Sequence, residues 1–421
     1  MKAAWSKLGS LCLGTSLLAA GCGAAGGTDK PATAGTSSGT GGSGASAGSA
    51  SAGASPAGGQ SVACVTNCGG GSGGTSGGAG GSSGNGGATG GSNAGAGGSS
   101  AGVGGGSAAK GFVCPAGPFD APGFATATPQ RVEGVPPPDA FNNDNNDFTN
   151  IEGDVWIGDA LYVSEINPKG GRPPARILKI TADDKVSILL PDSGSNGLAT
   201  NDAGELFAAL HKDGSVDKLS LTGGAATPLA TAFMGMPFDS PNDLSVHHNG
   251  TVYFTDPSWQ APMPPPQAAT RAYRIPPGGM PVAIEQLDQP NGITLSKNQD
   301  FLYIGGNQLK KYPVMADGSL GAGVTFVTNG GGDGMVIDCA DNLYVAGPKC
   351  GDGNQCMQNS VAVFSSAAAF LGSFNVAGLG QSTNVAFGGI DHKTLYVSGQ
   401  GAGAAQKGLF KVAMNLPGMP Y

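Results

Sequence analysis

Residues 250–255 read GTVYFT, a glycine followed by the β-branched and aromatic residues that are typical of a strand. Five other segments have the same pattern. The six central aromatic residues are Tyr162, Phe207, Tyr253, Tyr303, Tyr344 and Tyr396. Their successive spacings are 45, 46, 50, 41 and 52 residues. Strand repeats of about 40 to 50 residues indicate a β-propeller. The sequence therefore predicts an all-β fold with six blades.

Each repeat contains enough strand-like sequence for a four-stranded blade. An inner strand precedes the signature, and two more strands follow it, such as RILKI at 176–180 and VSILL at 186–190. We expect the segment at 130–135 to pair with the last blade. That pairing closes the ring, so that no long edge strand is exposed.

The propeller is predicted to span residues 111–421. This part carries 17 Lys and Arg against 28 Asp and Glu, a net charge of −11. Binding to phosphates needs a basic surface, so nucleic acid is excluded as a partner. We expect a monomer that acts on a small-molecule substrate.

Residues 1–21 have the charged start and short apolar run of a signal peptide. The run ends in Leu18-Ala19-Ala20-Gly21-Cys22, which resembles a bacterial lipobox, although Ala19 stands where leucine is usual. Cys22 is then the lipidation site. A lipid on Cys22 would be the protein's only membrane contact. Because Gly23 follows it, we expect the outer membrane or the cell surface. The alternative is a secreted, unlipidated product.

A low-complexity linker is predicted at 22–110. Of the 88 residues from 23 to 110, 33 are glycine, and serine and alanine supply much of the rest. Such a segment cannot bury enough apolar surface to offset the entropy of ordering, so we expect a disordered tether.

The chain has eight cysteines, of which Cys12 leaves with the signal peptide and Cys22 carries lipid. An even set of six in an oxidising compartment predicts disulfides. The simplest of the 15 connectivities pairs Cys64 with Cys68, Cys350 with Cys356 and Cys114 with Cys339. A zinc site is the alternative, but paired CxxC motifs are lacking.

A polar residue stands 10 to 12 positions before each central aromatic. These residues are Glu152, Asn196, Asn242, Asn291, Asp333 and Asn384. Inner strands line the channel of a propeller, so equivalent positions should form a ring at one level. Oxygen ligands suit calcium or magnesium, and a cation would offset the repulsion between the acids. The alternative is that these are turn residues, because Asn-Gly is also a turn signal.

Long connections on the same face, at 166–175, 257–269 and 347–360, are expected to shape a substrate pocket. His211 and Trp259 are candidate pocket residues, together with Asp256, Asn307 and Lys349. The alternatives are a solvated loop position for His211 and a rim-covering role for Trp259.

These motifs together resemble the gluconolactonase / regucalcin (senescence marker protein) family of six-bladed propellers. The matching stretches are IEGDVW at 151–156, SNGLATNDAGELF at 195–207, DSPNDLSVHHNGTVYFTDPSW at 239–259, QPNGITLSKNQDFLYI at 289–304, GDGMVIDCADNLYVA at 332–346 and TNVAFGG at 383–389.

The resemblance implies one divalent cation, with calcium favoured over zinc, magnesium or manganese. Glu152, Asn291 and Asp333 look like its ligands, and Asn242 like a fourth ligand or a substrate contact. Asp333 also resembles the general base. Asn196 and Asn384 are further candidate substrate contacts. There are departures: EGD with Asp154 replaces EGP, and an arginine usual after the His211 motif is missing.

The function that the resemblance implies is lactone hydrolysis, in which the cation polarises the carbonyl and Asp333 assists water. Two alternatives stay open. One is cleavage of organophosphates or aryl esters at the same site, and the other is a non-enzymatic ligand-binding propeller with a structural cation.

Overall fold

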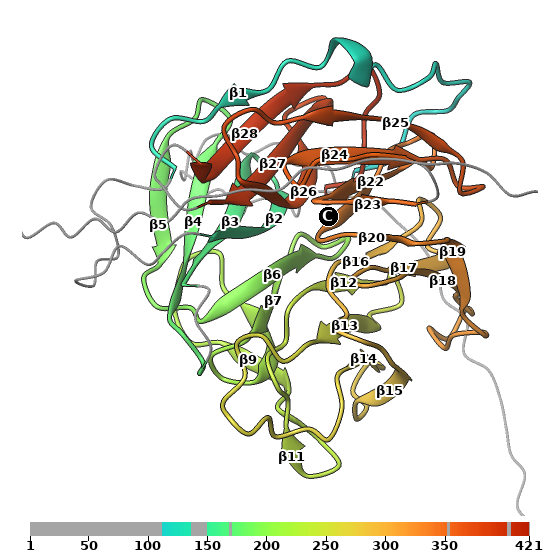
Figure 1. Ribbon diagram of the computed structural model, residues 1–421. Helices are drawn as coiled ribbons and strands as arrows, with labels where there is room; N and C mark the ends of the chain where they lie inside the picture. The colour runs from blue at the N-terminus through green and yellow to red at the C-terminus, as the bar shows by residue number, and fades with distance from the viewer. Residues whose placement is uncertain (1–111, 136–149, 168–170, 352–353, 402–405, 421) are drawn as a thin grey trace, which may run out of the picture. The chain divides into compact units, whose positions relative to one another are not determined.

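The computed structural model describes residues 112–135, 150–167, 171–351, 354–401 and 406–420. The predicted signal peptide, Cys22, the linker and the Cys64–Cys68 pair lie outside these ranges. Within them the chain forms mainly strands, together with the 3-10 turn η1 (Phe124–Thr126). None of the helical structure in this part is long or apolar enough to cross a bilayer. Six four-stranded antiparallel sheets confirm the predicted six-bladed β-propeller (Figure 1).

The first three blades each run outward from an inner strand to a partly exposed outer strand. Blade 1 contains β2 (Asn150–Ile157), β3 (Ala160–Ile166), β4 (Ala175–Thr181) and β5 (Val186–Leu190). Blade 2 contains β6 (Ser195–Thr200), β7 (Leu206–Leu210), β8 (Ser215–Leu219) and β9 (Thr227–Ala230). A small hairpin of β10 (Ala232–Phe233) and β11 (Met236–Pro237) comes next. Blade 3 contains β12 (Leu244–Val246), β13 (Val252–Asp256), β14 (Arg271–Ile275) and β15 (Val282–Gln286).

The last three blades repeat this order. Blade 4 contains β16 (Ile293–Leu295), β17 (Phe301–Ile304), β18 (Leu309–Pro313) and β19 (Val324–Val327). Blade 5 contains β21 (Met335–Ile337), β22 (Leu343–Ala346), β24 (Ser360–Phe364) and β25 (Phe370–Asn375), and its loops add the paired β20 (Gly330–Gly331) and β23 (Lys349–Cys350). Blade 6 contains β26 (Gln381–Gly388), β27 (Thr394–Gln400) and β28 (Gly408–Ala413), completed by β1 (Gln130–Arg131).

The ring closes where the sequence predicts it. β1 pairs antiparallel with β28, matching Gln130 with Lys411 and Arg131 with Phe410. The six inner strands contact one another in a closed cycle, β2–β6–β12–β16–β21–β26–β2. Figure 1 shows this order as the blades pass around a common centre, from green β2–β5 to red β26–β28. The repeated polar positions near the inner-strand starts are therefore brought around one axis.

The core lies between neighbouring blades. All six signature aromatics are buried, and Tyr253, Tyr303 and Tyr344 are fully so. Apolar residues of adjacent blades form shared clusters; in one of them Phe238, Phe254 and Tyr273 of blade 3 pack with blade 2 residues. Burial of this apolar surface is the main force that holds the blades together.

Both ends of the described chain bind at the face where the inner strands end. The predicted disulfide Cys114–Cys339 joins the N-terminal segment to the turn after β21 of blade 5. The predicted disulfide Cys350–Cys356 lies in the loop between β22 and β24 of the same blade. Near the C-terminus, the carbonyls of Pro417 and Pro420 accept hydrogen bonds from the backbone N–H groups of Cys339 and Trp156. The C-terminal segment thus connects blades 5 and 1.

Candidate metal centre

The six predicted ring residues all stand at one end of the inner strands. Glu152, Asn196 and Asn384 lie within the first residues of β2, β6 and β26. The other three residues each stand two positions before their strand, and they are Asn242, Asn291 and Asp333. Because the six inner strands surround one axis, these similar positions along them place all six residues near the same level.

Hydrogen bonds join successive blades at three junctions of this ring. The Gly197 N–H donates to the carbonyl of Asn242 at 2.5 Å, which joins blades 2 and 3. The Thr255 hydroxyl donates to the carbonyl of Asn291 at 2.6 Å, which joins blades 3 and 4. The Gly334 N–H donates to the carbonyl of Thr383 at 2.8 Å, which joins blades 5 and 6.

Glycines allow the inner strands to approach this closely. Gly153 has a φ of +64°, and a Cβ there would lie 2.2 Å from the carbonyl oxygen of Asn196. A Cβ on Gly334 would lie 2.3 Å from the side chain of Asn384. Both distances are below any normal contact, so a larger residue would force the backbone of blade 2 to shift at Gly153 and the Asn384 side chain to move at Gly334.

The two ring acids occupy a strongly negative environment. Burial, followed by the negative charges of three aspartates, raises the pKa of Glu152 well above its usual range; these are Asp333, Asp243 and Asp154. Burial and the charge of Asp243 likewise raise the pKa of Asp333, although hydrogen bonds partly oppose this. Every charge that acts on Glu152 is negative.

Asp243 is a buried acid that the repeat pattern does not predict, because it follows Asn242 instead of occupying the repeated position. Its Oδ1 accepts the N–H of Leu244 at 2.9 Å, and its Oδ2 accepts the N–H of Ile293 at 3.1 Å. Burial raises its pKa to about 7. The carboxylate therefore links blade 3 to blade 4, close enough to Glu152 and Asp333 for its charge to act on both.

Asp154 is the second missed acid, and it stands where the resemblance leads one to expect proline. It lies in a bulge of β2 between Glu152 and Val155. Its carboxylate is buried, and among the described residues neither oxygen accepts a well-formed hydrogen bond. Burial raises its pKa to about 7, against a smaller opposite effect of nearby Ser398.

The donor set fits a hard divalent cation. Buried carboxylates that repel one another are costly, as are the partnerless oxygens of Asp154, and a nearby divalent ion offsets both effects. Two carboxylates and two carboxamides supply the expected ligands, Glu152, Asp333, Asn242 and Asn291. In the part of the chain that the structure describes, no three His, Cys, Asp or Glu side chains converge as a metal-binding group.

The candidate substrate contacts differ in their exposure. Asn196, Asn242 and Asn384 are buried at the ring, whereas the side chain of Trp259 is 42% exposed. Asp256 does not face a pocket: its carboxylate is buried and accepts the backbone N–H groups of Asp239 and Ser240.

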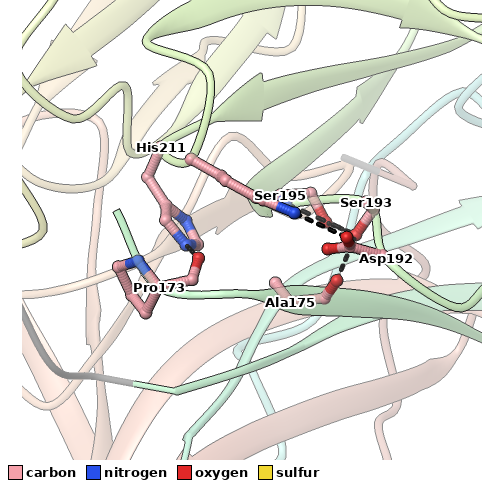
Figure 2. A network of polar contacts seen from close by, with 7 residues as sticks. Pro173, Ala175, Asp192, Ser193, Ser195 and His211 are labelled. Carbon is pink, nitrogen blue, oxygen red and sulfur yellow. Dashed lines mark hydrogen bonds and ion pairs between the residues drawn. The ribbon is translucent and has the colours of Figure 1, made fainter. Parts of the chain in front are cut away.

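His211 is neither solvated nor open to a pocket. Its side chain has no exposed surface, and Nε2 lies 2.8 Å from the carbonyl oxygen of Pro173. Figure 2 shows the imidazole turned towards Pro173, with the Ser193–Ser195 contact drawn in the same view. The imidazole therefore connects the rims of blades 1 and 2 and has no surface for a ligand.

The resemblance leads one to expect an arginine soon after His211, but in this structure Arg172 of blade 1 contacts this rim instead. Nη1 of Arg172 donates to the carbonyl of His211 at 2.9 Å, and Nη2 donates to that of Phe238 at 2.8 Å. Sequence reasoning missed it because Arg172 precedes the His211 motif by a whole blade.

A six-bladed propeller with buried acids and amides at one mouth of its channel defines the class of this protein. Residues 151–400 match the model of the SMP-30/Gluconolactonase/LRE-like region, and the chain belongs to this family.

Individual relatives agree with this assignment. A gluconolactonase of Zymomonas mobilis is 28% identical over 244 residues, which cover 47% of this chain and 64% of that protein's length. A gluconolactonase structure from Xanthomonas campestris superposes with a TM-score of 0.55 at 23% identity, covering 68% of this chain and 89% of that one. Regucalcin from Agrobacterium tumefaciens, described as calcium-binding, gives a TM-score of 0.52 at 18% identity, covering 65% and 92%. The two structures support the fold.

Proposed function

We propose that the protein is a divalent-cation-dependent lactone hydrolase of the gluconolactonase type. The observation that carries this proposal is the pair of buried carboxylates, Glu152 and Asp333, which belong to one ring and have raised pKa values. Membership of the family and the gluconolactonase relative support lactones as the substrate class.

Glu152, Asn242, Asn291 and Asp333 would hold the cation, and calcium suits their oxygens. When bound, such an ion supplies Lewis-acid polarisation of a carbonyl. The amides of Asn196 and Asn384 can donate hydrogen bonds to a polar substrate at the same level of the channel.

The chain's own chemistry centres on Asp333. In its ionised form the carboxylate accepts a proton from the attacking water as the water oxygen bonds to the carbonyl carbon. The ring C–O bond then breaks, and the leaving oxygen takes up a proton to give the hydroxy acid.

The test is a panel of sugar lactones, acyl lactones, phosphotriesters and aryl esters. The full chain is stripped with a chelator and reloaded separately with Ca²⁺, Zn²⁺, Mg²⁺ or Mn²⁺. We expect lactone opening that falls at least about 100-fold in Asp333→Ala, whereas Asp391→Ala, which removes an exposed acid, keeps it. Absence of lactone opening with every metal would refute the proposal, and faster phosphotriester cleavage would favour that alternative.

A further inference from the structure

Two glutamines form a chain of side-chain amides that ends on Asp333. Gln381 and Gln400 stand directly opposite each other in the antiparallel pair β26–β27, so their side chains share one face of blade 6. Nε2 of Gln400 donates to Oε1 of Gln381 at 3.1 Å. Nε2 of Gln381 in turn donates to Oδ2 of Asp333 at 3.4 Å.

The chemistry of the three groups fixes the direction of this chain. An ionised Asp333 can only accept hydrogen bonds, so Gln381 must present its NH₂ group to it. The Oε1 atom of Gln381 then needs a donor, and Gln400 supplies one. Rotating the Gln381 amide by half a turn would place oxygen against oxygen at Asp333 and nitrogen against nitrogen at Gln400.

The backbone around Gln381 holds its side chain against blade 5. Gly347 faces it, and a Cβ there would lie 3.5 Å from both Cγ and Nε2 of Gln381 and 2.6 Å from the carbonyl oxygen of Ser382. The N–H of Gly380 also donates to the carbonyl of Gln400 at 3.0 Å. The Gln381 side chain is therefore partly buried beside Gly347 of blade 5, where the absence of a Cβ leaves room for it.

We propose that Gln381, held by Gln400, is a positioning residue that fixes the rotation of the Asp333 carboxylate and so sets the affinity of the ring for a divalent cation. The inference rests on the cation site of the proposed function. A neutral amide suits this task, because it orients the carboxylate without adding a positive charge that would compete with the cation. Neither glutamine lies in the stretches that carry the family resemblance.

The test is calorimetric titration of the chelator-treated full chain with Ca²⁺. We expect Gln381→Leu to weaken Ca²⁺ binding about ten-fold, in the range found for groups that orient metal ligands. Gln400→Leu should weaken it about three-fold, and the double variant should match Gln381→Leu alone, because Gln400 acts only through Gln381. Gln358→Leu is the matched control. The side chain of Gln358 is exposed, and only its backbone carbonyl, which the substitution keeps, bonds to the N–H of Ser382 beside Gln381.

Unchanged Ca²⁺ affinity in Gln381→Leu, or an undiminished effect of Gln400→Leu in the Gln381→Leu background, would overturn the inference. Gln381→Met, of similar size, replaces Gln381→Leu if that variant does not fold. The lactone assay separates the two proposals: a wild type that binds Ca²⁺ but opens no lactone fails as a lactonase, and the titration still decides the role of Gln381. A wild type that binds no divalent cation refutes both.

Discussion

The side-chain amide of Asn384 donates to Oε2 of Glu152 at 3.4 Å, although 232 positions separate the two residues. This contact joins blade 6 to blade 1, where the propeller closes. The Thr383 hydroxyl makes a second bond across the same junction, to the carbonyl of Ile151. The position of Glu152, one of the four proposed cation ligands, thus depends on correct closure of the ring, which the β1–β28 pairing secures.

Gly153→Ala should test how tightly the ring is packed. The added Cβ would meet the Asn196 carbonyl at 2.2 Å in a residue with φ of +64°, so we expect a loss of roughly 3 kcal/mol in the free energy of unfolding. Chemical denaturation measures it.

Gly158→Ala is the matched control, because Gly158 has the same φ of +64° with no atom within 4 Å of the added Cβ. This variant reports backbone strain alone, and we expect about 1 kcal/mol. Equal losses in the two variants would mean that close packing of blades 1 and 2 does not contribute.

The repeats predicted the fold because a propeller is built from local units. The spacing of the aromatics set the number of blades, and the polar residues before them set one level of the channel. Gln130–Val135 could be assigned to the last blade because an open ring would leave an exposed edge strand. These inferences require only that each repeat folds in the same way.

Features that break the repeat could not be predicted in this way. Asp243 and Asp154 stand beside the repeated positions, and nothing in the spacing shows that their carboxylates are buried together. His211 was expected in the substrate pocket, or else in a solvated loop, but the Pro173 segment of another blade covers it. The Gln381–Asp333 contact likewise depends on the facing of neighbouring blades, which a single repeat does not contain.

Glu152→Gln should have opposite effects with and without a cation. In chelator, the substitution removes one of several mutually repelling buried acids, so we expect the free energy of unfolding to rise by about 1–2 kcal/mol. With Ca²⁺ at about 100 times its Kd, the wild type should gain about 2.7 kcal/mol and the variant little. Thermal unfolding in both buffers measures this. A variant stabilised by Ca²⁺ as strongly as the wild type would exclude Glu152 as a ligand.

The two disulfides should differ in their contribution to stability. Cys114–Cys339 closes a loop with a sequence separation of 225, and Cys350–Cys356 one of 6. Loop-closure entropy predicts about 5 kcal/mol for the first and about 2 kcal/mol for the second. We therefore expect Cys114→Ser with Cys339→Ser to lower the midpoint of urea unfolding more than Cys350→Ser with Cys356→Ser. The reverse order would show that joining the N-terminal segment to blade 5 adds little to the free energy of unfolding.

His211 should make the protein less stable in mild acid. Burial, with a smaller effect of Arg172 and Lys212, lowers its pKa to about 4 from an ordinary value of about 6.5. Between these values the unfolded chain binds the extra proton, so the free energy of unfolding rises with pH from about 4 to 6.5 and is constant above that range as far as this group is concerned. Relative to His211→Asn, whose side chain does not titrate, the wild type should lose about 3 kcal/mol more on going from pH 7 to pH 4. Urea unfolding at unit pH steps measures both slopes, and their difference cancels the titration of other groups. Parallel curves for the two proteins would mean that His211 has the same pKa in the folded and the unfolded state, so that the hydrogen bond to the Pro173 carbonyl offsets the cost of burial.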